Sequence, residues 1–549
     1  MCGIFSTLCD ERIENLKIYF NKIKHRGPDD SGIRYLDIIN NKPLIFGFHR
    51  LSIIDLDEKS MQPLGYDNLY LICNGEIFNY KNLQEKYNLY SKTGSDCEVI
   101  IHLYNLFGRN KYALQKTLQE IDGEFSFVLY DKKNKTLIAA RDPFGIRPLF
   151  YSCSGMEICF ASELKALGFR KNVKAFKPGS YIYREHHGKY FNIEFDTYYN
   201  LSIILIKNTI YTDLSFIKYK INELLKKSVK LRLMSDRPLG CFLSGGVDSS
   251  IVTALVAKHN PNIECFTIGL DNSVDIKAAI KVITHLNNNG ANIKHHIVNF
   301  TIEEGIQSIK DVIKHLETYD ITTIRASTPQ YLLSKYISQN TNIKVILSGE
   351  GSDEVNASYL YNRLAPSSSE LHKDSLRLVN ELYMFDNLRV DRTTAAFGLE
   401  VRVPFLCKHY VEFMFCVDSS LKMCNYQIEK KLLRDSFAEE NLLPHDILYR
   451  TKEAFSDAVS SNEISWYKSL CSYIDTIITD KQFLQEQKKY INNIPPTKEA
   501  LFYRQIFEEL YPGRENILTH YWMPSWIDTK GDPSATVLDC YTKLDTISV

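Results

Sequence analysis

"PLGCFLSGGVDSS", residues 238–250, is the stretch that decides the fold. A short apolar run predicts a buried strand, and the glycines Gly245 and Gly246 end that run in a tight turn. The next residues, "DSSIVTALVAKH", predict a helix. The turn and the helix N-terminus together expose backbone N–H groups that can bind a phosphate. The loop is not a Walker A motif, because it has no Gly-Lys-Ser/Thr.

Strands and helices continue to alternate beyond this stretch. "IECFTIGL" (263–270) and "HHIV" (295–298) predict strands, and "DIKAAIKVITHL" (275–286) between them predicts a helix. This alternation favours a doubly wound parallel sheet. "KVILSGEGSDE" (344–354) repeats the strand-and-turn pattern. Since strand ends of a parallel sheet meet at one edge, we expect the SGG and SGE turns to be neighbours there.

An acidic residue stands in each of the two turns, Asp248 in the first and Asp353 in the second. A carboxylate beside a phosphate is repelled unless a cation lies between them, which predicts Mg²⁺ bound by these two residues. The alternative is that glycine-serine turns with an acidic cap are ordinary connections between a strand and a helix and bind no ligand. The recurrence of the pattern after two buried strands argues against that alternative.

The first 195 residues have a different pattern. Short apolar runs bounded by turn residues predict β-strands, and two helical stretches interrupt them, one of them "CEVIIHLYNLFG" (97–108). The pattern predicts stacked sheets flanked by helices. From about residue 213 an amphipathic helix opens the second half, and beyond 354 the chain is mostly helical to about 510. We therefore place a domain boundary near 200–212.

Composition restricts the class of partner. The 549 residues contain 66 Lys+Arg and 66 Asp+Glu, so the chain has no net charge that would favour nucleic acid or an anionic membrane. We see no signal peptide and no run of 18 apolar residues, and we expect no membrane span. The 13 cysteines show no C-x-x-C pair, which favours reduced thiols and a cytoplasmic protein.

Cys2 directly follows the initiator methionine, which is either chance or chemistry. A cysteine made N-terminal by removal of Met1 has its own α-amine as base, with a reference pKa of about 7.7–8.0. Other polar residues of this half could hold a free amino acid. Arg50 would bind an α-carboxylate, Asp96 an α-ammonium, and Asn74 with the backbone N–H of the next residue would form an oxyanion hole.

These motifs resemble those of the glutamine-dependent (glutamine-hydrolysing) asparagine synthetase family. The N-terminal motifs alone would indicate only a class-II glutamine amidotransferase, and the C-terminal ones narrow the match. The motifs are "HRGPD", "RLSIID", "NGEIFNY", "TGSDCEV", "RDPFGIRPLF", "SGGVDSS", "ETYDITTIRAST", "LSGEGSDE" and "RVPFL". The resemblance implies an N-terminal-nucleophile αββα glutaminase over residues 2–205. A PP-loop domain, similar to adenine nucleotide α-hydrolases and with a helical C-terminal part, then covers 213–530.

The resemblance also implies roles for individual residues. Cys2 is the expected glutaminase nucleophile, Glu350 the base for attack by ammonia, and Lys452 a stabiliser of charge on the phosphate, with Arg325 a weaker candidate for the same anion. The expected glutamine-binding residues are Arg50, Leu51, Ser52, Ile53, Ile54, Asn74, Gly75, Glu76 and Asp96. The expected ATP-binding residues are Leu243, Ser244, Gly245, Gly246, Asp248, Ser249, Ile268, Ser348 and Gly349.

The implied activity is synthesis of L-asparagine from L-aspartate and L-glutamine, with ATP as co-substrate and Mg²⁺ as cofactor. A β-aspartyl-AMP intermediate would form, and glutamate, AMP and pyrophosphate would be released. The partners are small molecules, with no nucleic acid or membrane, and a homodimer is left open. Two alternatives are a catalytically silent or regulatory paralogue and a related carboxylate-adenylating enzyme such as a β-lactam synthetase. The second typically lacks the cysteine present here.

Three positions depart from the family pattern. A Phe-Gly-Gly-Tyr stretch after "GSDE" is replaced by "VNASY", so that Asn356, Ala357 and Ser358 stand at this point. Cys407 replaces the aspartate of "RVPFLD", where a thiol would be a poor helix cap. Ala458 replaces a glycine after "SD". We expect these changes to affect rate and substrate affinity more than the type of reaction.

Overall fold

The computed structural model describes residues 1–185, 195–207, 209–424, 428–451, 459–460 and 465–534. The chain forms two compact units. Unit 1 contains residues 1–200 together with two later segments, Met234–Pro238 and Thr394–Glu400, and unit 2 contains the remainder. The domain limits 2–205 and 213–530 stay predictions. The stretch expected to be a linker contains helix α5 (Leu201–Lys207).

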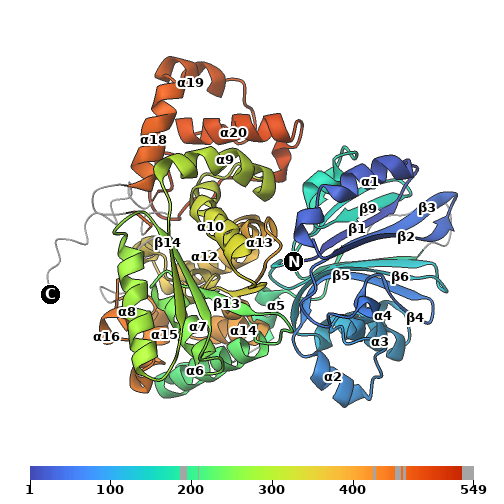
Figure 1. Cartoon of the computed structure of the whole chain (residues 1–549), viewed down its shortest axis with the longest axis horizontal. Helices are drawn as coiled ribbons and strands as arrows, with labels where there is room; N and C mark the ends of the chain where they lie inside the picture. Colours follow the sequence, from blue (N-terminus) through green and yellow to red (C-terminus); the bar gives the residue numbers. More distant parts are fainter. Residues whose placement is uncertain (186–194, 208, 425–427, 452–458, 461–464, 535–549) are drawn as a thin grey trace. The chain divides into compact units, whose positions relative to one another are not determined.

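Unit 1 contains two six-stranded antiparallel sheets (Figure 1). In order across the first sheet, the strands are β10 (Val173–Ala175), β8 (Phe150–Ser154), β9 (Glu157–Ala161), β1 (Gly3–Leu8), β3 (Lys42–Arg50) and β2 (Asp30–Ile39). In the second sheet they are β12 (Phe195–Thr197), β11 (Ser180–Glu185), β7 (Thr136–Arg141), β6 (Gly123–Asp131), β5 (Leu69–Ile77) and β4 (Leu64–Tyr66). Apolar side chains of both sheets, among them Phe46 and Val128, form one buried core.

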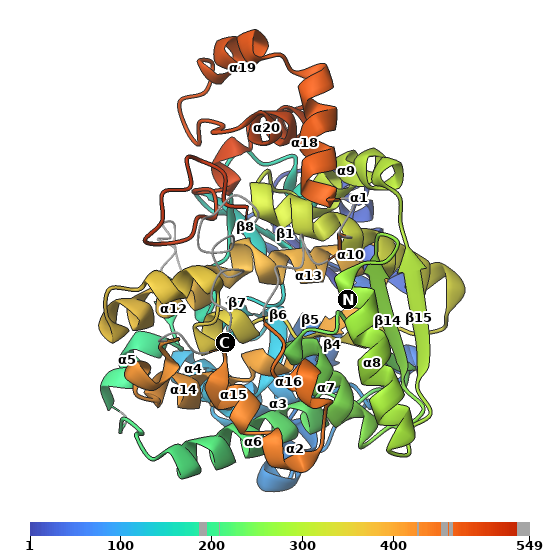
Figure 2. The same ribbon diagram turned by 90° about the vertical axis from the view of Figure 1, so that its left-hand side faces the viewer.

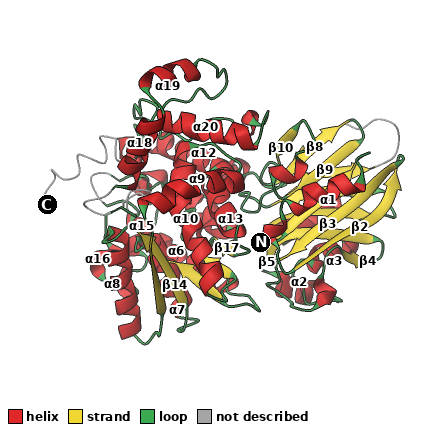
Figure 3. Cartoon of the chain, turned by 45° about the horizontal axis from the view of Figure 1, so that its top comes forward, coloured by secondary structure: helices red, strands yellow, loops and turns green. Residues whose placement is uncertain are grey.

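Helices cover the outer faces of both sheets, as Figures 1 and 3 show. Helix α1 (Ile13–Asn21) packs on the first sheet, where the ring centroids of Phe20 and Phe5 lie 5.8 Å apart. The second sheet shares a core with α2 (Tyr80–Tyr87), α3 (Glu98–Leu106) and α4 (Lys111–Glu120). The αββα sandwich is thus confirmed.

The sequence predicted two helical stretches in this half, but four α-helices precede residue 121, so the predicted number was too small. The shortest of them shows why. Helix α2 has only eight residues, most of them polar, and buries only Leu83, so it contains few apolar residues by which a helix is recognised in the sequence.

Unit 2 is built on a five-stranded sheet in which the three pairs β14–β15, β13–β14 and β13–β16 are parallel. In order, the strands are β15 (Lys294–Asn299), β14 (Glu264–Gly269), β13 (Leu239–Phe242), β16 (Val345–Leu347) and β17 (Glu400–Arg402). Cys241 of β13 is in register with Cys265 of β14 on one side and Leu347 of β16 on the other. Helices α7 (Val247–Ala257) and α8 (Val274–Asn288) lie beside these strands (Figure 2). The parallel sheet predicted from "PLGCFLSGGVDSS" is confirmed.

The rest of unit 2 is helical, as expected. Besides α6 (Leu214–Leu231), its helices are α9 (Ile302–Leu316), α10 (Ile321–Asn340), α11 (Ser352–Asn356), α12 (Ser368–Glu381), α13 (Asp386–Ala395), α14 (Lys408–Cys416), α15 (Lys431–Asp435), α16 (His445–Leu448), α18 (Trp466–Ile477), α19 (Asp480–Gln487) and α20 (Lys498–Leu510). Among the described residues, no helix is both long and apolar enough to cross a membrane.

Cys407 occupies the N-cap position of α14, and its side chain makes no capping hydrogen bond there. We expect Cys407→Ser to stabilise the first turn of α14 by about 1 kcal/mol relative to Cys407→Ala, because a hydroxyl oxygen accepts a hydrogen bond from the unpaired backbone N–H groups. Hydrogen exchange of the amides of residues 409–411 measures this, with about fivefold greater protection in the serine variant. Equal protection in the two variants would mean that the site cannot accommodate a cap.

Candidate active sites

The thiol of Cys2 lies beside the loop that follows β3. The backbone N–H of Leu51 donates to Cys2 Sγ at 3.4 Å, and Sγ lies 3.6 Å from the Leu51 carbonyl oxygen. Arg26 holds the preceding backbone, since its Nε donates to the carbonyl oxygen of Cys2 at 2.9 Å. Arg26 is itself fixed by an ion pair with Glu163 at 2.7 Å. The candidate nucleophile is therefore held against the segment predicted to bind glutamine.

Arg50 is buried at the end of β3, and its guanidinium faces its own loop. Nη1 donates to the carbonyl oxygen of Asp57 at 2.8 Å, and Nη2 donates to that of Asp55. The Asp55 side chain accepts a hydrogen bond from the backbone N–H of Gly94 at 2.7 Å, so this loop is tied to the "TGSDCE" segment. The structure thus brings two predicted glutamine-binding segments together, while the carboxylate-binding role of Arg50 stays a prediction.

The end of β5 supplies the carboxamide predicted for the oxyanion hole. Asn74 is fully buried, and neither its amide nitrogen nor its amide oxygen has a hydrogen-bond partner. Gly75 has φ +143°, and a Cβ built there would lie 2.0 Å from the carbonyl oxygen of Glu124. Asp96 is tied to the same strand, because its Oδ2 accepts from the Ile77 backbone N–H at 2.6 Å. A buried carboxamide without a hydrogen-bond partner lowers the stability of the fold. Such a group is expected where a ligand supplies the missing hydrogen bonds.

Met1 alters the chemistry of this site. Its α-amine is buried and donates to the carbonyl oxygen of Leu399 at 3.3 Å. Burial lowers the pKa of this amine to about 6. Burial also raises the pKa of the Cys2 thiol to about 12, so the thiol is protonated at neutral pH while Met1 precedes it.

The second site is a cavity of about 270 Å³ in unit 2, at the carboxyl ends of β13, β14 and β16. Most of the predicted ATP-binding residues line it: Leu243, Ser244, Gly246, Asp248, Ser249, Ile268, Ser348 and Gly349. The predicted base Glu350 and the predicted metal ligand Asp353 line it too. Gly245 does not line the cavity. Its φ is +77°, and a Cβ there would lie 2.5 Å from that of Ala278 in α8, so the glycine permits the turn to pass the helix. Direct ATP contact by Gly245 stays a prediction.

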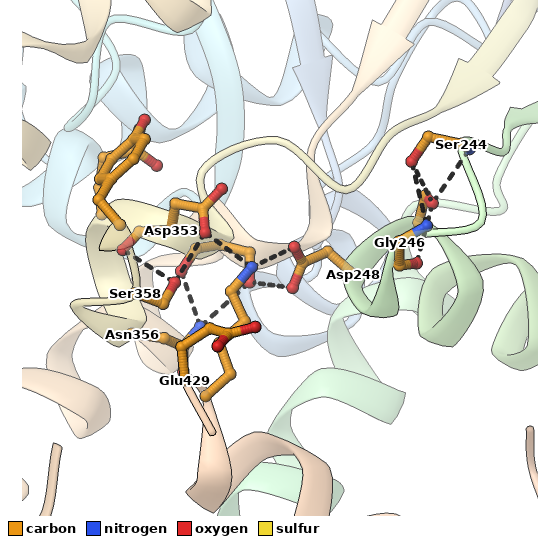
Figure 4. Close-up of polar contacts among 12 residues, drawn as sticks. Ser244, Gly246, Asp248, Asp353, Asn356, Ser358 and Glu429 are labelled. Atoms are coloured by element: carbon orange, nitrogen blue, oxygen red, sulfur yellow. Dashed lines mark hydrogen bonds and ion pairs between the residues drawn. The ribbon is translucent and has the colours of Figure 1, made fainter. Parts of the chain in front are cut away.

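The two glycine turns are neighbours, as expected. A Cβ at Gly349 would lie 2.8 Å from the backbone nitrogen of Ser249, which brings the SGE turn against the first turn of α7. Within the first turn, the Ser244 hydroxyl accepts from the Gly246 backbone N–H at 3.3 Å (Figure 4).

Asp248 and Asp353 both bind one ammonium group, that of Lys430. The distance from Lys430 Nζ to Asp353 Oδ1 is 2.7 Å, and Nζ also pairs with Asp248 Oδ2. Burial opposes the charge, but the two carboxylates outweigh it and raise the pKa of Lys430 above its usual value. Since the carboxylate oxygens converge on one cation, this donor set fits Mg²⁺, which one or two carboxylates and substrate phosphates usually bind.

Glu350, the predicted base, is held by Arg389 of α13, whose Nη2 donates to Glu350 Oε2 at 2.8 Å. Arg389 also pairs with Asp386 at 2.5 Å. Near them, burial and then the carboxylates of Asp386 and Asp353 raise the pKa of Glu354 to about 8. This part of the cavity therefore offers both an arginine and carboxyl groups for an amino-acid substrate.

The sequence analysis missed Lys430, Arg389 and Asp386. The pair "EK" just before "KLLRD" was the available signal for the lysine, but it belongs to no motif that sequence spacing alone identifies. Arg325, a weaker candidate for a phosphate contact, lines the cavity and pairs with Glu499 through two hydrogen bonds of 3.1 and 2.6 Å, and its role at the phosphate stays a prediction. Lys452 and Ala458 lie outside the described residues.

The fold and the two sites define a class of protein, a glutamine amidotransferase domain joined to a nucleotide-binding synthetase domain. Comparison with known families agrees. The glutamine amidotransferase domain family matches residues 1–197, and the asparagine synthase family matches residues 220–377 and 361–528.

Curated relatives match over almost their whole length. A probable glutamine-hydrolysing asparagine synthetase of Acanthamoeba polyphaga mimivirus is 44% identical over 98% of this chain and 100% of its own. The glutamine-hydrolysing asparagine synthetases of Gallus gallus and Homo sapiens are 42% and 40% identical, each over 98% of this chain and 99% of their own. The chain belongs to the glutamine-hydrolysing asparagine synthetase family.

Retention of Met1 should abolish the use of glutamine, because the α-amine of Cys2 is then lost as a base and the thiol stays protonated. The test compares chain that retains Met1 with chain released from a cleavable fusion so that Cys2 is the first residue. Intact mass verifies each N-terminus, and glutamate release from glutamine is measured. Equal glutaminase rates would contradict the role given to the α-amine.

Gly349→Ala should weaken ATP binding about tenfold or more, because the new methyl group must displace the backbone of Ser249. Calorimetric titration with ATP and Mg²⁺ measures this affinity. Gly65→Ala is the control, since a Cβ there makes only ordinary contacts of 3.8 Å or more. Unchanged ATP affinity in Gly349→Ala would show that the tight approach of the two turns is not needed.

Proposed function

We propose that this chain catalyses ATP-dependent synthesis of L-asparagine from L-aspartate and L-glutamine, releasing L-glutamate, AMP and pyrophosphate. The observation that carries the proposal is that Asp248 and Asp353 both pair with the ammonium group of Lys430 within the nucleotide cavity. That arrangement suits the phosphates of ATP and lies in the same cavity as Glu350. Family membership supports the same activity.

In the glutaminase step, Cys2 Sγ attacks the side-chain carbonyl carbon of glutamine, and its own α-amine takes the thiol proton. Asn74 and the backbone N–H of Gly75 stabilise the oxyanion. The carbon–nitrogen bond breaks, ammonia leaves, and water hydrolyses the thioester to glutamate. Arg50 binds the α-carboxylate and Asp96 the α-ammonium. The absence of a hydrogen-bond partner for the Asn74 amide supports its part in this step.

In the synthetase step, the β-carboxylate of aspartate attacks the α-phosphorus of ATP, and pyrophosphate leaves. Leu243 and Ile268 flank the adenosine, and the turns at Ser244 and Ser348 bind phosphate oxygens. Asp248 and Asp353 would hold Mg²⁺, which when bound neutralises phosphate charge and favours departure of pyrophosphate.

Ammonia then attacks the β-carbonyl carbon of β-aspartyl-AMP, and AMP leaves. Glu350 accepts the proton from the attacking nitrogen, and the 2.8 Å ion pair with Arg389 fixes the direction of its carboxylate. Arg389 and Asp386 are well placed to contact the aspartate substrate, because both line the cavity beside Glu350. Lys452 stabilises charge on the reacting phosphate.

We further propose that the protein works in the cytoplasm as a homodimer and acts on small molecules rather than nucleic acid. No disulfide joins any of the 12 described cysteines, which supports a reducing compartment. The zero formal net charge favours small-molecule substrates over nucleic acid. The homodimer rests on the family resemblance alone.

Product analysis tests the proposed activity. Purified chain should release AMP and pyrophosphate only when aspartate and ATP are both present, and asparagine when glutamine or ammonia is added. Release of AMP and pyrophosphate at the same rate with and without aspartate would favour a related carboxylate-adenylating enzyme. ATP binding without any product would favour a silent paralogue.

Cys2→Ala should abolish asparagine synthesis from glutamine and preserve synthesis from added ammonium chloride, since the nucleophile serves only the first step. Asparagine is quantified by chromatography with each nitrogen source. Cys153→Ala is the control, because this partly exposed thiol lies on β8. Loss of synthesis from both nitrogen sources in Cys2→Ala would refute the separation of the two steps.

A further inference from the structure

The segment "VNASY" lies directly against the candidate Mg²⁺ ligands. It begins in the short helix α11, which follows the SGE turn and ends at Asn356. Ala357 then adopts φ +53°, a left-handed conformation that favours glycine. The departure from the family pattern therefore places two polar side chains, Asn356 and Ser358, on either side of a turn residue with a left-handed backbone.

Ser358 binds the Asp353 side chain. Its Oγ donates to Asp353 Oδ1 at 2.7 Å, and its backbone N–H donates to the Asp353 carbonyl oxygen at 3.0 Å (Figure 4). Asp353 Oδ1 is the atom that also pairs with Lys430 Nζ at 2.7 Å. Since Ser358 is 1% exposed, water does not compete freely for this bond. The Ser358 hydroxyl thus fixes the position of Asp353 Oδ1, the oxygen that faces the Lys430 ammonium group.

Asn356 acts on the other carboxylate through one intervening residue. Its Nδ2 donates to the Ser352 carbonyl oxygen at 2.8 Å and to Ser352 Oγ at 3.2 Å. The Ser352 hydroxyl donates in turn to Asp248 Oδ1 at 2.6 Å. The amide oxygen of Asn356 accepts from the Tyr410 hydroxyl at 3.4 Å, so both ends of the side chain are held.

We propose that Ser358 and Asn356 are positioning residues, which orient Asp353 and Asp248 for the divalent cation that accompanies ATP. This inference rests on the proposed function for the identity of the ligand. A glycine at position 358 has no hydroxyl to offer Asp353. Groups that hydrogen-bond to metal ligands typically contribute 10- to 100-fold to metal affinity, so the segment tunes how much Mg²⁺ the site requires.

Mg²⁺-dependent ATP binding tests this proposal without relying on turnover. ATP binding is measured by calorimetry over a series of MgCl₂ concentrations, without aspartate, and again in EDTA. We expect Ser358→Ala to need about tenfold more Mg²⁺ for half-maximal ATP binding, with ATP affinity in EDTA unchanged. Ser358→Thr keeps the hydroxyl and should restore the wild-type Mg²⁺ requirement. Asn356→Ala should raise the requirement in the same direction as Ser358→Ala.

Ala357→Gly is the matched control, because it changes the same turn but removes no hydrogen-bond donor. We expect its Mg²⁺ requirement to equal that of the wild type. A wild-type Mg²⁺ requirement in Ser358→Ala would overturn the proposal, as would an equal loss in Ser358→Ala and Ser358→Thr, which would trace the effect to packing. Weaker ATP binding in EDTA would also contradict it.

Failure of the proposed function gives a different result. If the wild-type chain bound ATP with Mg²⁺ but made no asparagine, the activity would be wrong while the binding series still decided the role of Ser358.

Discussion

Two carboxylates that meet at one cation are the constraint on which unit 2 depends. Asp248 and Asp353 come from turns after different strands, and both pair with Lys430 Nζ. Two neighbouring carboxylates that are only partly exposed repel each other unless a cation lies between them. The parallel register of β13 with β16 brings the turns to the same level, and Gly349 permits their close contact. The lysine, whose side chain is 2% exposed, completes the arrangement from the residue before α15.

The candidate site of unit 1 has a different feature, a polar side chain without a hydrogen-bond partner inside the packed core. The Asn74 carboxamide is fully buried and makes no hydrogen bond, although leaving such a group unpaired costs about 1–3 kcal/mol. Gly75 next to it cannot be replaced without a clash with Glu124. The unpaired Asn74 amide therefore lowers the stability of unit 1 at the position where it would stabilise a ligand's carbonyl oxygen.

The sequence predicted those parts of each site that belong to continuous motifs. "SGGVDSS" and "SGEGSDE" each contain a strand end, a turn and an acidic residue within a few positions, so the neighbouring turns could be inferred from topology alone. Lys430 and Arg389 could not be inferred in this way. Each comes from the helical region, where spacing does not reveal which side chain faces the cavity, and only tertiary packing brings it to the acidic turns. The number of helices in unit 1 was underestimated for a related reason, because a helix as short and polar as α2 buries a single leucine.

Departures from a family pattern illustrate the same limit. "VNASY" suggested an altered backbone, because two glycines were missing. Ala357 adopts a left-handed conformation, which costs an L-residue about 1–2 kcal/mol. The flanking bond from Ser358 to the Asp353 carboxylate is of the strength that offsets such a cost, since hydrogen bonds to charged groups contribute about 1.5–3 kcal/mol. The new side chains form hydrogen bonds to and around the Asp353 and Asp248 carboxylates, and an altered backbone relative to the family stays a prediction. Whether such a change matters depends on which atoms the new side chains reach, and the sequence does not contain that information.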